Sequence, residues 1–103
     1  MIEIIELEWE DKIYVIPEFS EVDADDLKLK YRDDVFSAIY SGLVYMLSDS
    51  TVERIPCFIL NEVVFEIDLE GAQDHIINCI EYFTEIEEYE KCSILINLKT
   101  KLQ

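Results

Sequence analysis

The chain is poor in basic residues, glycine and proline. Of 103 residues only 8 are Lys or Arg, against 24 Asp or Glu, which gives a formal net charge of −16 with the single histidine neutral. Nucleic acids and anionic membranes bind proteins through Lys and Arg, so this charge argues against both and favours a basic protein as partner. With 50% hydrophobic residues, 2 glycines and 2 prolines, the composition also excludes disordered and fibrous classes.

The cysteines and the first residues bear on the compartment. Cys57, Cys79 and Cys92 are odd in number and widely spaced, and each lies in an apolar run. This pattern is typical of buried thiols rather than of a disulfide framework. The chain opens on alternating Ile and Glu, without the basic and uninterrupted apolar regions of a signal peptide. No apolar run approaches the roughly 20 residues that span a bilayer, so we expect a cytoplasmic protein.

Motifs that carry chemistry are missing as well. The sequence has no Gly-rich phosphate loop and no nucleophile elbow. His75 and Cys79 are four residues apart, but no further zinc ligands follow at a recognisable spacing. Asp23 and Asp25 stand as in the opening of a calcium loop, but Leu27 occupies its fifth position and the central glycine is absent. We therefore predict no enzyme activity, no cofactor and no metal.

Hydrophobic periodicity predicts a hairpin and a short strand at the start of the chain. Residues 5–10 alternate apolar side chains with glutamates, and an apolar run over residues 13–16 follows a turn at Glu10-Asp11. The apolar phase slips between Ile4 and Ile5, which means either a bulge there or Ile2 and Ile4 on the opposite face from Leu7 and Trp9. Residues 27–32 alternate apolar with basic side chains, which predicts a strand with one cationic face. Cross-strand pairing with the glutamates of the first strand is the simplest role for these basic residues.

A helix is predicted next, capped by Asp33 or Asp34 and ending at about Leu47. Its circumference is mostly apolar. Such a helix is either covered on more than one side or lends a patch to a partner.

The second half predicts a hairpin, a helix and a strand. Two apolar runs, 55–60 and 63–69, are separated by Asn61-Glu62, which predicts a tight turn. Residues 72–89 show the clearest helical periodicity in the chain, and residues 92–99 alternate as a final strand would. The predicted order is strand, strand, short strand, helix, strand, strand, helix, strand. We expect a single α+β domain over residues 1–103, with two helices and a mainly antiparallel sheet of five to six strands.

The outward face of the predicted helix 72–89 carries a stripe of carboxylates. The simple explanation is an ordinary solvated helix surface. Like charges three and four residues apart, however, destabilise a helix by about 0.2–0.5 kcal/mol per pair. This face repeats such pairs and has almost no neighbouring lysine. A surface selected only for solubility usually intersperses both signs. Tyrosines beside carboxylates are typical anchors of interface centres. The candidate partner-binding residues are Asp74, Glu81, Tyr82, Glu85, Glu88 and Tyr89, together with the row Glu6, Glu8 and Glu10.

In size, acidity and lack of a catalytic signature, and through this set of carboxylates and tyrosines, the chain resembles the small immunity proteins that protect bacteria from toxins. Those of contact-dependent growth inhibition systems are included in this class. The resemblance is one of class and transfers no residue roles. It implies a cytoplasmic inhibitor that binds and neutralises a basic enzyme, a nuclease toxin being the leading candidate.

Two other functions stay open. A nucleic-acid mimic, such as an anti-CRISPR inhibitor made by a phage, would carry the same charge but space its carboxylates in two rows like the strands of a duplex. A non-enzymatic adaptor or homodimeric subunit would instead use the apolar helix around Val35, Val44, Tyr45 and Met46 as its contact surface.

Overall fold

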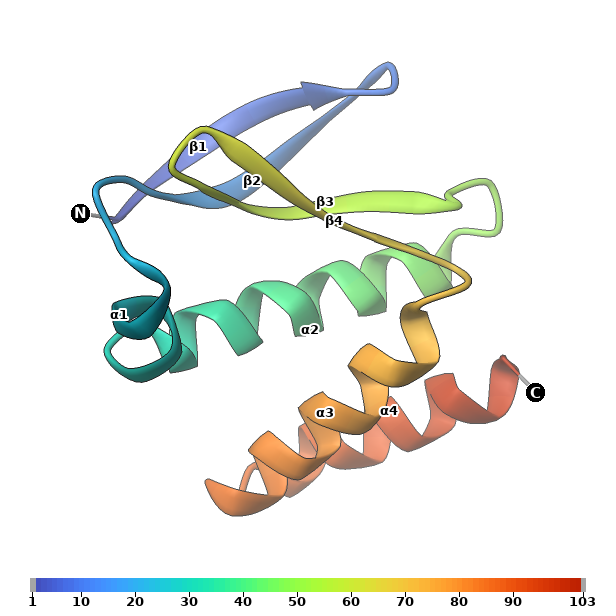
Figure 1. Cartoon of the computed structure of the whole chain (residues 1–103). Helices are drawn as coiled ribbons and strands as arrows, with labels where there is room; N and C mark the ends of the chain where they lie inside the picture. Colours follow the sequence, from blue (N-terminus) through green and yellow to red (C-terminus); the bar gives the residue numbers. More distant parts are fainter. Residues whose placement is uncertain (1, 103) are drawn as a thin grey trace.

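The computed structural model describes residues 2–102, and the chain is built from two successive units of the same element order (Figure 1). Each unit is a β-hairpin followed by two helices. The first contains β1 (Ile2–Trp9), β2 (Lys12–Phe19), α1 (Ala24–Leu29) and α2 (Arg32–Ser48), and the second contains β3 (Arg54–Leu60), β4 (Val63–Asp68), α3 (Ala72–Glu85) and α4 (Tyr89–Lys101). The α+β class is confirmed. The predicted strand and helix counts are wrong, because the described residues form four strands and four helices.

The four strands form one mixed sheet in the order β1-β2-β3-β4. Each hairpin is antiparallel, but β2 and β3 run parallel and pair only at Glu18↔Ile59 and Phe19↔Leu60. The expectation of a mainly antiparallel sheet of five to six strands is therefore wrong. Two helices join β2 to β3, and such a long crossover returns the chain to the sheet in the same direction.

The predicted strand 27–32 is in fact α1 and the start of α2. The side chain of Asp23 accepts a hydrogen bond from the backbone N–H of Asp26 at 2.8 Å, which caps the short helix α1 at its first turn. Leu29 is exposed, so the alternation of Leu and Lys does not correspond to two faces of a sheet. The proposed pairing of these basic residues with the glutamates of β1 is wrong as well, since Arg32 instead pairs with Glu85.

The predicted strand 92–99 is also helical and belongs to α4. Cys92, Leu95 and Leu98 are buried at intervals of three residues, whereas Ile94 and Ile96 are exposed. The apolar residues of this segment satisfy both a period of two and a period near three, and packing against α3 selects the second. The helix predicted over 72–89 consequently ends at Glu85, and a turn precedes α4.

Both predicted hairpin turns are confirmed. Glu10 and Asp11 in the first turn, and Asn61 and Glu62 in the second, all have positive φ. Two consecutive residues with positive φ are typical of the two-residue type I′ turn, whose twist matches that of the flanking strands.

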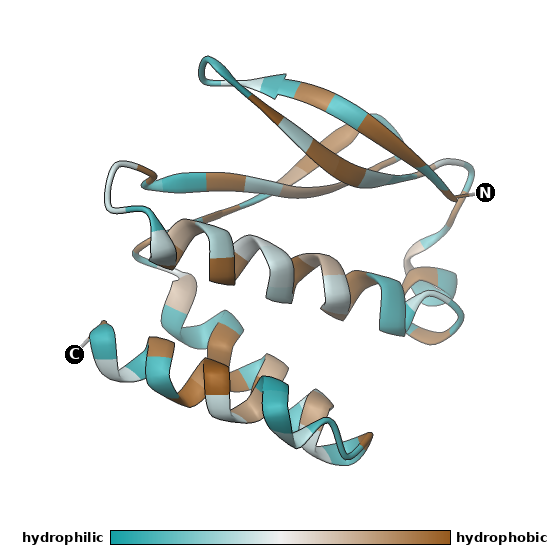
Figure 2. Ribbon diagram, turned by 180° about the vertical axis from the view of Figure 1, so that it is seen from behind, coloured by the Kyte–Doolittle hydropathy of each residue, from teal (hydrophilic) through white to brown (hydrophobic). Residues whose placement is uncertain are grey.

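Helix α2 is the central layer of the molecule, between the sheet and the α3–α4 pair (Figures 1 and 2). On the sheet side Gly42 approaches β3 so closely that a Cβ at this position would lie 2.6 Å from Sγ of Cys57. On the other side the ring of Phe36 stacks on that of Tyr82 in α3, with centroids 4.2 Å apart. Coverage on two sides explains why α2 is apolar around most of its circumference.

Candidate partner-binding surface

The structure places most of the predicted acidic stripe on the outside of the molecule. Asp74, Glu81 and Glu85 are exposed on α3, and Glu88 is exposed in the turn between α3 and α4. Tyr89 begins α4 and is 59% exposed. This part of the stripe is available to a partner.

Tyr82 corrects the predicted set because its ring is only 2% exposed. It stacks on Phe36, and its hydroxyl donates a hydrogen bond to the carboxylate of Asp33 at the start of α2. The guanidinium of Arg32 lies 4.9 Å from the centre of the same ring. Tyr82 thus holds α3 against α2 and is not offered to a partner.

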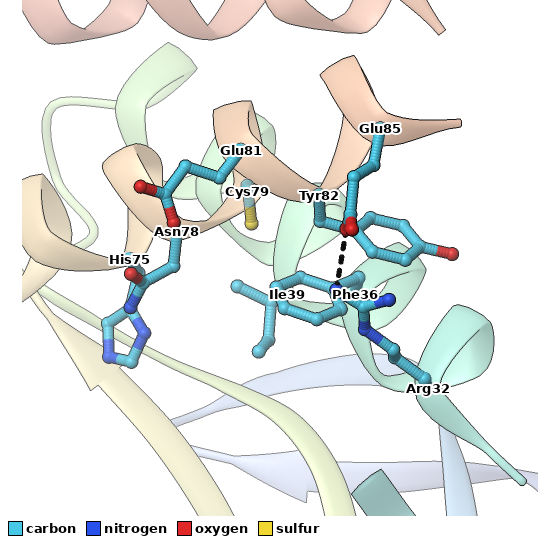
Figure 3. A pocket seen from close by; sticks show the side chains of 9 residues that line it. All are labelled: Arg32, Phe36, Ile39, His75, Asn78, Cys79, Glu81, Tyr82 and Glu85. Carbon is cyan, nitrogen blue, oxygen red and sulfur yellow. Dashed lines mark hydrogen bonds and ion pairs between the residues drawn. The ribbon is translucent and has the colours of Figure 1, made fainter. Parts of the chain in front are cut away.

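Beside Tyr82, a cavity of ≈ 570 Å³ opens between α2 and α3 (Figure 3). Arg32 and Glu85 both line it and form an ion pair, with 2.8 Å between nitrogen and oxygen. His75 and Cys79, the pair weighed for zinc or nucleophilic chemistry, both line this cavity. Cys79 is fully buried, and burial raises the pKa of its thiol from 9.0 to about 12. A thiol with that pKa provides no thiolate for catalysis at neutral pH.

The turn between α3 and α4 joins exposed apolar side chains to carboxylates. Ile86 is 45% exposed and lies three residues before the exposed ring of Tyr89. The exposed carboxylates of the same turn are Glu85, Glu87, Glu88 and Glu90. We call residues 85–90 the acidic turn. Protein–protein interfaces usually have apolar and aromatic side chains at the centre and polar ones at the rim.

Little positive charge of the chain itself neutralises the acidic turn. Among residues 2–102 the ion pairs involve Glu85 but none of Glu87, Glu88 and Glu90. The nearest lysine in the sequence, Lys91, places its ammonium group 5.0 Å from the centre of the Phe83 ring and is half-buried. The negative charge of the acidic turn is thus directed to solvent.

Backbone geometry adds a second observation on the acidic turn. Glu87 has a φ of 62°, and the N–H of Glu88 donates to the carbonyl of Phe83 at 2.8 Å, closing the end of α3. Glycine is the usual residue in this left-handed position after a helix, because a Cβ there is strained. This chain has a carboxylate instead. Across the described residues, all six positions with positive φ are non-glycine and five of them are acidic, namely Glu10, Asp11, Glu21, Glu62 and Glu87.

The other predicted row is exposed in the sheet layer, with Glu6 and Glu8 on β1 and Glu10 in the turn that follows it. Helix α2 separates this layer from α3 and α4, so the structure does not bring the two acidic sets together (Figure 1). Glu10 also lies 3.9 Å from the guanidinium of Arg54. The candidate surface therefore divides into an α3 part and a separate β1 part.

Sequence reasoning missed Ile86 and Glu87 because it extended the helix to residue 89. The two residues then fell on a continuous helical face rather than in a turn. Glycine, which would have marked the end of α3, is absent at this position. The signal that could have located the turn is the run of charged residues Glu85, Glu87, Glu88 and Glu90 around a single Ile.

Within residues 2–102, no group of three or more His, Cys, Asp or Glu side chains is arranged to hold a metal ion. None of the helices in the described part combines the length and the apolarity needed to cross a membrane. Comparisons with protein-family models, curated proteins and solved structures found no match.

Proposed function

We propose that this chain is an acidic inhibitor that acts by binding a basic enzyme, without chemistry of its own. The observation that carries the proposal is the acidic turn, where exposed Ile86 and Tyr89 stand among four carboxylates. Charge of this kind speeds the encounter with a cationic protein, and the desolvated aromatic and aliphatic side chains slow its dissociation.

A nuclease toxin is the partner class that we propose. An enzyme that binds nucleic acid presents cationic side chains to the phosphates of its substrate, and these side chains are complementary to a row of carboxylates. In this role the chain is an immunity protein of the cytoplasm. Asp74, Glu81, Glu85 and Glu88, with Tyr89 as an aromatic anchor, form the contact on the α3 side.

The alternatives receive less support from the arrangement. A nucleic-acid mimic requires two adjacent carboxylate rows, but α3 carries one row and the β1 row lies in the opposite outer layer. A subunit built on α2 requires that helix to be free, yet of the four residues named for it Met46 is buried and Val35 and Val44 are half-buried. Tyr45 alone of the four is exposed. Both remain outcomes of the experiment below.

The first test is capture of the partner from the native cell by the full chain, followed by identification and an activity assay. The expected partner is basic, degrades DNA or RNA, and loses that activity at a one-to-one ratio with this chain. An acidic partner, or nuclease activity that persists with the chain bound, would contradict the proposal.

The second test separates local charge from total charge. The variant Glu87→Gln/Glu88→Gln/Glu90→Gln removes three carboxylates from the acidic turn, and Glu53→Gln/Glu62→Gln/Glu70→Gln removes three exposed carboxylates elsewhere. Both variants reduce the net negative charge by the same amount. We expect association to slow by about tenfold for the first and less than about twofold for the second, measured at 0.15 M salt. Equal slowing would mean that only total charge matters and would remove the acidic turn from the interface.

A further inference from the structure

The first hairpin and the rest of the sheet diverge beyond their short junction. From Phe19 and Leu60, β2 and β3 separate toward the Glu10-Asp11 turn (Figure 1). A groove of ≈ 450 Å³ lies in this region, lined by β2, by Ile2 and Ile4 of β1, by α2 and by the Ile55–Cys57 segment of β3. We call it the hairpin groove. Its wall on β2 includes Ile13 and Val15, which are 69% and 67% exposed.

The backbone of β2 is available along the hairpin groove. Residues 12–17 pair with β1 on one edge, and pairing with β3 is confined to residues 18 and 19. The carbonyl of Phe19 accepts a hydrogen bond from the N–H of Asn61 and therefore points to the β3 edge of β2. Backbone groups of every second residue in a strand point to the same edge, so the N–H and C=O groups of Ile13 and Val15 also point to this edge, where no strand pairs with them. Pro17 has no N–H to donate on this edge, which explains why the pairing with β3 stops there.

The dimensions of the hairpin groove suit a short extended peptide. On α2 it reaches from Asp34 to Tyr45, and 11 residues of helix span about 16 Å. An extended chain covers about 3.3 Å per residue, so about five residues fit along it. Ser37 and Ser41 supply hydroxyl groups on the α2 wall.

Charge determines which peptide the hairpin groove accepts. Among the described residues that line it, Asp34 is the one charged group. Glu6 and Glu8 pair with Val15 and Ile13 and therefore share their face of the hairpin. A second copy of this chain, with a net charge of −16, would be repelled. An extended segment that alternates apolar residues with Lys or Arg matches both the apolar wall and the acidic rim.

We infer that the hairpin groove binds an extended cationic segment of the partner protein as an additional strand on the free edge of β2. Main-chain hydrogen bonds to Ile13 and Val15 would hold the segment, and its apolar side chains would cover the exposed faces of these two residues. The inference rests on the proposed function for the sign of the partner's charge. It assigns a role to the Glu6 and Glu8 row that the acidic turn leaves unused.

The test is a titration of the isotope-labelled full chain with a synthetic seven-residue peptide that alternates lysine and valine, followed by NMR. We expect the largest amide shifts at Ile13 and Val15, with further shifts at Ser37 and Ser41. Val15→Lys should weaken binding by at least about tenfold, because it places a like charge against the peptide. Val63→Lys, at a position 69% exposed on β4 and outside the hairpin groove, is the matched control and should change binding by less than about twofold.

Further peptides and variants make the outcome decisive. A peptide with N-methyl groups on the bonding edge should lose binding, and one with glutamate in place of lysine should not bind. Shifts confined to the acidic turn, an unchanged affinity of Val15→Lys, or dimerisation through the hairpin groove would each overturn the inference. The variant Glu87→Gln/Glu88→Gln/Glu90→Gln should bind the peptide normally, so a failure of the acidic turn and a failure of the hairpin groove are distinguishable.

Discussion

The two hairpins of this protein share a turn type and an element order but differ in how deeply they are buried. In β3 every residue from Ile55 to Ile59 is buried, because α2 and the neighbouring strands cover it. In β2 buried and exposed side chains alternate, and Ile13 and Val15 remain open to solvent. Strand β3 is therefore buried along most of its length, whereas β2 contributes one face to the core and presents on the other an apolar surface that the chain itself does not cover.

The largest expected difference between the hairpins is in the cost of truncating an isoleucine. Ile67 on β4 is 1% exposed and Ile13 on β2 is 69% exposed. We expect Ile67→Ala to lower the free energy of unfolding by about 2–5 kcal/mol, and Ile13→Ala by less than about 1 kcal/mol. Urea denaturation followed by circular dichroism measures both. Similar losses at the two sites would show that Ile13 is covered in solution.

Alkaline pH should lower the free energy of unfolding through buried thiols of the second unit, which contains all three cysteines. Burial raises the pKa of Cys57 and of Cys79 from 9.0 to about 12. The unfolded thiols ionise near pH 9 while the folded ones stay neutral, so their stabilising contribution is complete below pH 9 and is lost as pH rises toward 12. We expect about 1 kcal/mol of lost stability per thiol between pH 9 and 10.

Urea titrations at several pH values measure this loss. The control is Cys57→Ala, in which the dependence on pH should be shallower although the protein is less stable at every pH. If the stability of Cys57→Ala falls with pH as steeply as that of the parent chain, the loss of stability comes from groups other than Cys57.

The smallest expected effect concerns the two type I′ turns, which favour glycine at their second position. Glu62→Gly converts the second turn to Asn-Gly, and Asp11→Gly alters the first turn in the same way. We expect Glu62→Gly to raise the free energy of unfolding by about 0.5–1 kcal/mol. The gain from Asp11→Gly should be smaller, since the first hairpin pairs with the rest of the sheet through two residue pairs and its turn lies at the far end from them. A larger gain at Asp11 would mean that both hairpins unfold with the core.

Much of the fold could be predicted from the sequence where one period dominated. The first hairpin followed from alternation before the Glu10-Asp11 turn, the second from two apolar runs around Asn61-Glu62, and α3 from a clear apolar stripe. The prediction failed at residues 27–32 and 92–99, where the same apolar residues fit a strand or a helix. In α1 the cap at Asp23 decided the outcome, and in α4 packing on α3 did. Neither effect is visible in local alternation.

The candidate surface was predictable in its charge but not in its shape. Exposed carboxylates on α3 followed from helical spacing, whereas the burial of Tyr82 depends on the contact with Phe36, a residue 46 positions away in the sequence. The hairpin groove depends on the separation of β2 from β3. Pro17 marks the residue at which pairing with β3 stops, but no pattern in residues 12–16 distinguishes a strand with a neighbour from one without.

The two-pair junction between β2 and β3 also bears on how the molecule opens. Pairing of residues 18 and 19 with 59 and 60 is the whole backbone link between the hairpins. With so short a ladder, the first hairpin is held on the core mainly by the side chains of Tyr14, Ile16 and Phe19. Substitutions at its exposed positions, such as Ile13 and Val15, then carry a small penalty for the domain, which leaves that face free to diversify in sequence while the scaffold is retained.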